Sequence, residues 1–211
     1  MIAPSQAALI LIDMQMGFIS PESSLCIAGA AATVPACAQA LQAARDAGVR
    51  VFHVRREYAA DGSDVETVRY DVWKEGGKPL SQDWPASLKA PVELSEREGE
   101  DVVMKPRFSA FFGTGLAERL RELGIGTVIL AGTTTPNCIR STCYDALSYD
   151  FNVVVLEDAT SSRTPEVQKA NIEDMRVIGA QIMSADEFSE RGCAAIDDIA
   201  AHVADETGVR R

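Results

Sequence analysis

Short runs of apolar residues recur along the chain, and each run has the length of a β-strand. Continuous apolar runs of about four to eight residues are typical of strands that are buried on both faces of a sheet. The chain contains six such runs, at residues 7–13, 49–54, 101–105, 126–132, 152–158 and 180–184. The pattern therefore predicts six buried strands, of which the sixth is the least marked.

Segments with helical spacing of apolar residues lie between these runs. They cover residues 34–48, 115–123, 138–149 and 165–178, and the first of them ends at Gly48, a residue type common directly after a helix. Strands and helices thus alternate along the chain. We expect a three-layer α/β/α sandwich with a central, mostly parallel six-stranded sheet of Rossmann-like type and right-handed crossovers.

Residues 56–99 interrupt this alternation. The segment holds much of the charge, the pair Gly76–Gly77, both Trp residues and several Pro residues. It predicts a long excursion of loop with one or two helices, of the kind that commonly forms a lid or an oligomer contact. Because no repeat and no second core are evident, we expect a single domain over residues 1–211.

The charge balance narrows the classes of partner. The chain of 211 residues has 20 Lys and Arg against 31 Asp and Glu, a net charge of −11. Phosphate backbones and anionic lipid repel such a chain, so a broad nucleic-acid or membrane surface is not expected. No apolar run approaches the ~20 residues of a membrane span, and the first residues do not resemble a signal peptide. A small-molecule substrate is the remaining expectation.

Cysteine and histidine counts limit the chemistry further. The five Cys residues are an odd number without a CxxC pair, which argues against a disulfide framework and for a reducing, cytoplasmic location. The two His residues, His53 and His202, are too few and too far apart for a His-rich metal site. We expect neither a metal nor a cofactor.

Three reactive residue types follow three different predicted strands. Asp13 ends the first, Lys105 ends the third, and Cys138 comes shortly after the fourth. The carboxyl ends of parallel strands meet at one edge of a sheet, where ligands bind in such folds. We therefore expect these three side chains to meet.

Their chemistry suits acyl transfer through a thioester. Pro136 can open a helix, which places Cys138 in its first turn, where the helix dipole and a nearby Lys105 favour a thiolate. Asp13 can accept the thiol proton and return it to a leaving amine. Backbone N–H groups at the helix start can hold the oxyanion. Cys143, five residues beyond Cys138, should not share its helical face.

Three segments carry a resemblance to a known family. They read LILIDMQMGFI at 9–19, KPRFSAFFGTGL at 105–116 and LAGTTTPNCIRSTCYDALSYDFNVVVLEDATSS at 130–162. The chain resembles the isochorismatase-like cysteine hydrolase superfamily, and the last segment is the most specific part of this resemblance.

The resemblance implies roles for particular residues. The family's catalytic Asp, Lys and Cys fall on Asp13, Lys105 and Cys138. A non-proline cis peptide joins Thr133 to Thr134, and the backbone N–H groups of Thr134 and Cys138 form the oxyanion hole.

The resemblance also separates branches of the family. Isochorismatases proper lack the nucleophilic Cys, and nicotinamidases bind a metal through an Asp and several His after the second strand. Here that segment, VFHVRREYAADG at 51–62, has one His and two Arg, which disfavours a metal-dependent nicotinamidase. The TTTPNC loop is similar to that of the N-carbamoylsarcosine amidase and biuret hydrolase group, with its ureidoacrylate- and maleamate-type amidases, which cleave small amides without metal.

Several residues are candidates for binding the substrate. By resemblance Arg163 holds a substrate carboxylate, and Arg55 or Arg56 at the end of the second strand is an alternative, since Arg pairs with carboxylates in a bidentate manner. The further candidates are Phe18, Phe108, Phe111, Thr135 and Asn137.

These observations predict a metal-independent cysteine amidohydrolase that cleaves a small, carboxylate-bearing amide or ureido substrate. One alternative is a nicotinamidase-like deamidase or isochorismatase-type hydrolase. Another is a non-catalytic binding protein, or a thiol-redox protein that uses Cys138 and Cys143. The resemblance implies a homo-oligomer, a dimer or tetramer, with residues 56–99 as a plausible contact.

Overall fold

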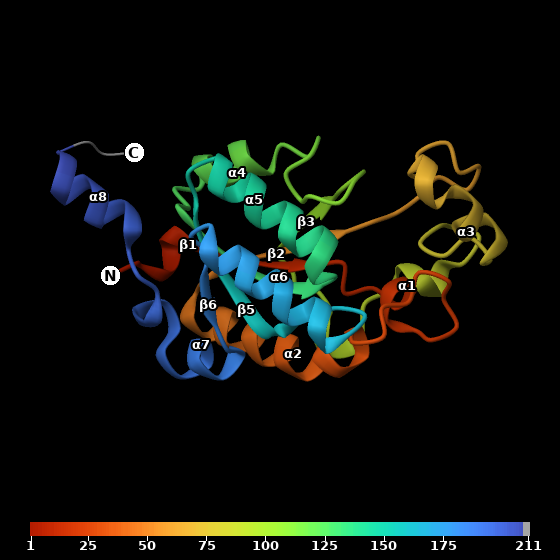
Figure 1. The fold of residues 1–211 in the computed structure, drawn as a ribbon, viewed down its shortest axis with the longest axis horizontal. Coiled ribbons are helices and arrows are strands. Elements are labelled where there is room, and N and C mark those ends of the chain that lie inside the picture. Colours follow the sequence, from red (N-terminus) through yellow and green to blue (C-terminus); the bar gives the residue numbers. More distant parts are fainter. Residues whose placement is uncertain (209–211) are drawn as a thin grey trace.

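A six-stranded sheet forms the centre of the molecule in the computed structural model, which describes residues 1–208 (Figure 1). All neighbouring strands pair in parallel, in the order β3-β2-β1-β4-β5-β6. The strands are β1 Ala7–Ile12, β2 Arg50–Arg55, β3 Asp101–Met104, β4 Thr127–Thr133, β5 Asn152–Ser161 and β6 Gln181–Met183. This confirms the predicted sheet, although β5 runs to Ser161 rather than ending at residue 158.

Helices cover both faces of the sheet. They are α1 Met16–Ile19, α2 Ala30–Ala47, α3 Tyr70–Glu75, α4 Leu116–Glu122, α5 Arg140–Ser148, α6 Pro165–Val177, α7 Ala185–Arg191 and α8 Ile199–Thr207. Figure 1 shows α2 and α7 on one face, and α4, α5 and α6 on the other. The three-layer α/β/α prediction is therefore confirmed.

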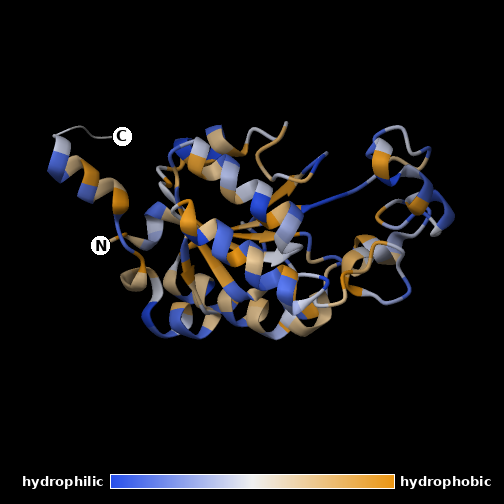
Figure 2. Ribbon diagram, in the orientation of Figure 1, coloured by the Kyte–Doolittle hydropathy of each residue, from blue (hydrophilic) through white to orange (hydrophobic). Residues whose placement is uncertain are grey.

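Alternation along β1 divides the core into two parts. Leu9 and Leu11 pack in the cluster with α2 and α7, whereas Ile10 and Ile12 pack in the cluster with α4, α5 and α6. Every residue of β1 and of β4 is buried, which explains why these strands read as continuous apolar runs. Figure 2 shows the strands as the hydrophobic centre of the molecule.

Helix α2 begins at Ala30, earlier than the predicted residue 34, so that Pro35 lies inside it. Three Ala residues, which are strong helix formers, extend the helix before the proline. The helix ends as predicted at Gly48, whose φ of 74° is in the left-handed region that glycine adopts without strain.

The excursion, residues 56–99, lies beyond the carboxyl edge of the sheet, with α3 near α1 (Figure 1). It contains α3 and the short 3-10 turns Thr67–Arg69, Pro85–Leu88 and Val92–Leu94. Within it Tyr58, Val65, Trp73 and Leu80 form a small hydrophobic cluster with Phe18 of α1. Trp73 Nε1 donates to the Pro79 carbonyl at 2.8 Å, which fixes this cluster internally.

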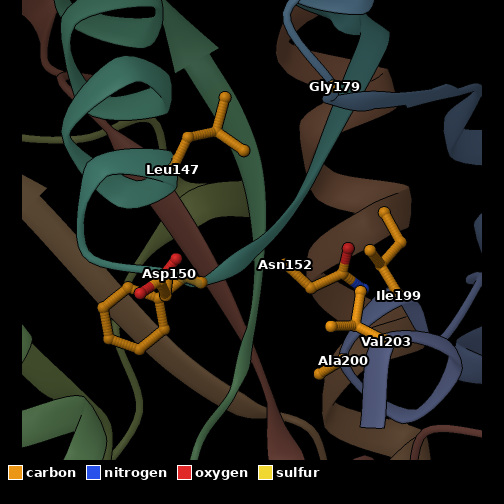
Figure 3. Close-up of a pocket in the computed structure, with 8 residues that line it drawn as sticks. Leu147, Asp150, Asn152, Gly179, Ile199, Ala200 and Val203 are labelled. Atoms are coloured by element: carbon orange, nitrogen blue, oxygen red, sulfur yellow. The ribbon is translucent and has the colours of Figure 1, made fainter. Parts of the chain in front are cut away.

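The opposite edge of the sheet carries a pocket of a different kind. It has a volume of about 280 Å³ and lies between α8 and the start of β5, lined by Leu147, Phe151, Asn152, Ile199 and Val203 among others (Figure 3). No nucleophilic or cationic side chain lines it within the described residues. Among those residues we also find no helix with the length and apolar character needed to span a membrane.

Candidate active site

Three strand ends bring Asp13, Lys105 and Cys138 together. Asp13 follows β1, Lys105 follows β3, and Cys138 lies in the turn after β4. Lys105 Nζ is 2.8 Å from Asp13 Oδ2 and donates to Cys138 Sγ at 3.5 Å. All three residues are buried. The structure thus places the three predicted catalytic side chains in mutual contact.

The backbone at Asp13 has an unusual conformation. Its φ is +53°, in the left-handed region, where Asp is among the better-tolerated non-glycine residues. The Asp13 N–H donates to the Val54 carbonyl at 2.9 Å, and the Gln15 N–H donates to the Asp13 carbonyl at 2.8 Å. These bonds hold the sharp turn after β1 in place, and with it the buried carboxylate.

The loop after β4 is shaped by close packing against neighbouring strands. Gly132 has a φ of +116°, and a Cβ there would lie 2.1 Å from the Ile12 carbonyl oxygen, so no other residue fits. The peptide bond between Thr133 and Thr134 is cis, as the resemblance implied. Thr134 Oγ1 and Thr135 Oγ1 both donate to the Ser161 carbonyl at 3.0 Å. Thr135, expected to contact substrate, is therefore buried as a brace of the loop.

The nucleophile turn, Thr135–Ile139, is a π turn with Pro136 near its start, and α5 follows it directly. Cys138 and Cys143 both belong to the core cluster on the side of the sheet that α4, α5 and α6 cover. Burial raises the pKa of the Cys143 thiol to about 12, so it is protonated at neutral pH.

The charge state of Cys138 differs from the predicted thiolate. Burial, and next the Asp13 carboxylate, raise the pKa of the Cys138 thiol to about 11, although Lys105 and Arg56 act in the opposite direction. Burial is the larger cause, and the Asp13 carboxylate, 2.8 Å from the Lys105 ammonium, adds to it, so the shift in pKa runs against the predicted thiolate. The resting group is a neutral thiol beside the Asp13 carboxylate and the Lys105 ammonium.

A pocket of about 310 Å³ opens at Cys138. Three of the predicted substrate contacts line this pocket, namely Phe18, Asn137 and Arg163. The lining also includes Ser24, Leu25, Cys26, Ile27, Val68, Arg69, Val72, Thr134 and Pro136. Its walls are thus largely apolar, with two Arg side chains among them, which suits a small molecule that carries a negative charge.

Several lining residues were not predicted from the sequence. Val68, Arg69 and Val72 belong to the excursion and reach the pocket from the Thr67–Arg69 turn and α3. The spacing of Val68 and Val72 by four residues was the available signal, since it marks one face of a helix. Val68 is 86% exposed and Val72 is 54% exposed, which is uncommon for apolar side chains away from a binding surface.

Other predicted contacts lie elsewhere. Arg55 forms an ion pair with Glu96 and does not line the pocket at Cys138. Phe111 packs in the core, with its ring centroid 5.8 Å from that of Phe151. Phe108 is half-buried, and the Arg69 guanidinium stacks on its ring at 4.7 Å, so it supports the pocket wall from behind.

Arg56 lies deeper than the other candidate Arg residues and is fully buried. Its Nη1 forms an ion pair with Glu66 and donates to Tyr58 Oη at 3.0 Å. The Gln15 side chain fixes its backbone through hydrogen bonds of 2.8 and 2.9 Å. Sequence reasoning missed Gln15, although it lies in the quoted segment at 9–19, and it missed Tyr58 and Glu66, which lie in none of the three segments that carry the resemblance.

His53, the histidine of β2, is engaged in a different interaction. Its Nε2 is 2.8 Å from Glu100 Oε2, and burial lowers the pKa of this imidazole. Within residues 1–208 no group of three or more His, Cys, Asp or Glu side chains is arranged to hold a metal ion.

Comparisons with known proteins agree with this geometry. The model of the isochorismatase domain matches residues 7–187. The chain is 38% identical to an Arabidopsis thaliana protein described as a "probable inactive nicotinamidase", over 87% of this chain and 94% of that protein. It is 34% identical to the maleamate amidohydrolase of Pseudomonas putida, over 80% of this chain and 78% of that enzyme.

Solved structures show the same fold. An isochorismatase family protein from Desulfovibrio vulgaris superposes with a TM-score of 0.83 at 41% identity, covering 88% of this chain and 97% of that one. The N-carbamoylsarcosine amidase from Thermoplasma acidophilum superposes with a TM-score of 0.71 at 28% identity, covering 86% of this chain and 98% of that one.

Proposed function

This chain belongs to the isochorismatase family, and we propose that it is a metal-independent cysteine amidohydrolase acting on a small amide or ureido substrate. As a member of this family with amidohydrolase relatives, it is a hydrolase of C–N bonds other than peptide bonds. The observation that carries the mechanism is the contact of Lys105 Nζ with both Asp13 and Cys138 at the edge of a pocket.

The first half of the reaction forms a thioester. Cys138 Sγ attacks the substrate carbonyl carbon while Asp13 takes the thiol proton. This proton transfer is required because the raised pKa keeps the thiol protonated before the attack. The backbone N–H groups of Thr134 and Cys138 hold the oxyanion. When the C–N bond breaks, Asp13 returns the proton to the departing ammonia or amine.

The second half regenerates the thiol. Asp13 takes a proton from a water molecule as the water oxygen attacks the thioester carbonyl. The C–S bond then breaks, and the proton passes from Asp13 to the leaving thiolate of Cys138. Lys105 stays protonated throughout, and its ammonium stabilises the negative charge that moves between Asp13 and Cys138.

The substrate carries a carboxylate in this proposal. Arg69 and Arg163 line the pocket, and Arg56 lies beneath it, so a local positive region exists in a chain of net charge −11. An Arg guanidinium can bind a carboxylate through two parallel hydrogen bonds. Arg163 stands at the rim, where a longer substrate would reach it.

The alternatives fit these residues less well. An isochorismatase-type reaction does not use a nucleophilic Cys, and this chain has one in contact with Lys105. A redox pair is disfavoured because burial raises the pKa of the Cys138 and Cys143 thiols to about 11 and 12. The Arabidopsis relative is described as inactive, whereas this chain retains Asp13, Lys105 and Cys138 in contact. The dimer or tetramer, the cytoplasmic location and the single-domain assignment of residues 1–211 stay predictions.

The test is ammonia release over a panel of carbamoyl amino acids, biuret, ureidoacrylate, maleamate and nicotinamide. Cys138→Ala should abolish turnover of any true substrate, at a loss of at least ~10⁴-fold, because no second nucleophile can form the thioester. Cys143→Ala is the matched control and should keep turnover. EDTA should have no effect. Unaltered turnover in Cys138→Ala contradicts the mechanism, and loss of activity in EDTA revives a metal-dependent reaction.

A further inference from the structure

The guanidinium of Arg56 is fully buried, yet only one of its edges is bonded. Nη1 pairs with Glu66 and donates to Tyr58 Oη, whereas Nε and Nη2 have no hydrogen-bond partner among the described residues. A buried charged donor without a partner is costly, so native proteins rarely leave one unless a ligand or water meets it. The unbonded edge therefore marks a place for an acceptor.

The unbonded edge of the Arg56 guanidinium lies near the pocket and the candidate catalytic residues. The Arg56 charge acts electrostatically on both Asp13 and Cys138. Its guanidinium carbon is 5.6 Å from the centroid of Phe108, and Arg69, which lines the pocket, stacks on the same ring at 4.7 Å. Arg56 therefore lies one layer beneath the pocket wall.

Tyr58 and Glu66 of the excursion hold the bonded edge of the Arg56 guanidinium. Tyr58 Oη donates to Glu66 Oε2 at 2.7 Å, so Glu66 binds both the guanidinium and the phenol. Burial acts to raise the pKa of Glu66, but the Arg56 charge and the Tyr58 hydrogen bond outweigh it and lower this pKa. Glu66 is thus an ionised, buried anchor with no direct contact to Asp13, Lys105 or Cys138 in the described contacts.

We propose that Glu66 and Tyr58 are positioning residues that hold one edge of Arg56, so that its Nε–Nη2 edge receives a carboxylate of the substrate. The proposal rests on the amidohydrolase function proposed above. It assigns the substrate class as small amido or ureido acids whose carboxylate lies only a few bonds from the scissile carbonyl, because Arg56 packs on Phe108 behind Arg69, and Arg69 lines the pocket that opens at Cys138. It also gives the excursion a role in substrate selection.

The first test compares two substrates of similar size, maleamate and its uncharged diamide maleamide, in which a second carboxamide replaces the carboxylate. Glu66→Gln should raise KM for maleamate by about 10- to 100-fold and change kcat by less than about threefold, because a fixed charge-assisted contact is lost from binding. The KM for maleamide should stay within about twofold. Tyr58→Phe should act in the same direction with a smaller effect, and Arg56→Lys should raise the maleamate KM most, since Lys cannot bind in a bidentate manner.

A matched control uses the ion pair between Arg50 of β2 and Asp101 of β3, which are 2.8 Å apart. Arg50→Lys and Asp101→Asn should leave both KM values unchanged. The proposal is overturned if Glu66→Gln and Tyr58→Phe keep the wild-type KM for maleamate, or if they raise both KM values equally, as general loosening of the site would.

A binding measurement separates this proposal from the proposed function. Titration calorimetry of Cys138→Ala with maleate needs no turnover, and Glu66→Gln in that background should weaken maleate binding at least ~10-fold. If the intact enzyme hydrolyses no amide but maleate binding still depends on Glu66, the function fails and the anion site stands. If turnover occurs but substitution of Glu66 or Arg56 leaves maleate affinity unchanged, the proposed anion site is refuted and the proposed function stands.

Discussion

Two charge clusters lie on the same sheet, one around the partly buried Glu100 and one around the buried Asp13, and they differ in how completely their carboxylates are bonded. Glu100 accepts hydrogen bonds from Arg45 at 2.7 and 2.9 Å and from the Arg97 N–H at 2.8 Å, and it lies 2.8 Å from His53 Nε2. Burial acts to raise the pKa of Glu100, but these hydrogen bonds lower it to about 2. This carboxylate has little capacity left to accept a proton.

Asp13 is the opposite case. It is fully buried, and the described residues offer it no partner other than Lys105 and the Cys138 thiol. The same contrast holds for the cations. Arg45 bonds Glu100 and the Ser95 carbonyl, whereas Arg56 leaves Nε and Nη2 unbonded. Saturated polar clusters stabilise a fold, and incompletely bonded ones are left to act on a ligand.

The contrast predicts that charge removal at Asp13 affects rate far more than it affects folding. Asp13→Asn should lower kcat by ~10³-fold or more, because the side chain can no longer take and return the thiol proton. Ammonia release under saturating substrate measures it, with circular dichroism to show that the fold is retained. A loss smaller than about tenfold would mean that another group carries the proton.

Removal of the Glu100 charge should have the reverse pattern. Glu100→Gln should leave kcat/KM within about threefold but lower the free energy of unfolding by about 2 kcal/mol, since the partly buried Arg45 loses its charged hydrogen-bond acceptor. Urea denaturation measures this loss. If Glu100→Gln is as stable as wild type, the ion pair between Arg45 and Glu100 contributes as little to stability as an exposed surface pair does.

The same variant tests the acid dependence of stability. The folded pKa of Glu100 is about 2, below its ordinary value of 4.5. Its stabilisation is therefore complete above pH 4.5 and is lost as the pH falls through about 2. Wild type should lose stability over that window, and Glu100→Gln should show a flatter profile there. Equal slopes in both proteins would contradict the low pKa.

The last prediction concerns the reactivity of the unliganded thiol. Alkylation of Cys138 by iodoacetamide should accelerate about tenfold per pH unit from pH 7 to 10, because the thiolate fraction rises in that way below a pKa of about 11. Peptide mass spectrometry separates Cys138 from Cys26, which lines the same pocket. An alkylation rate that levels off below pH 8 would contradict this pKa. It would show that Cys138 is already a thiolate at neutral pH, as its place at the helix start near Lys105 predicts.

Much of the fold was predictable because the signals are local. The apolar runs of β1 and β4 identify buried strands, and alternation with helices makes those strands parallel. Parallel strands then bring Asp13, Lys105 and Cys138 to one edge from three distant places in the sequence. Phe111 was predicted to line the pocket but packs against Phe151 instead. An aromatic residue in a loop does not by itself indicate whether its side chain faces the pocket or the core.

The sequence by itself thus determined the sheet, its edge and the candidate nucleophile, since strand pattern and chain direction are properties that each segment carries alone. Only the tertiary structure decided the burial of Cys138 beside Asp13 and Lys105, and the ion-pair partners of the Arg residues. Glu96 engages Arg55, and Glu66 engages one edge of Arg56. Burial and ion pairing depend on groups that folding brings from other segments, and no local pattern records which neighbour a charge will meet.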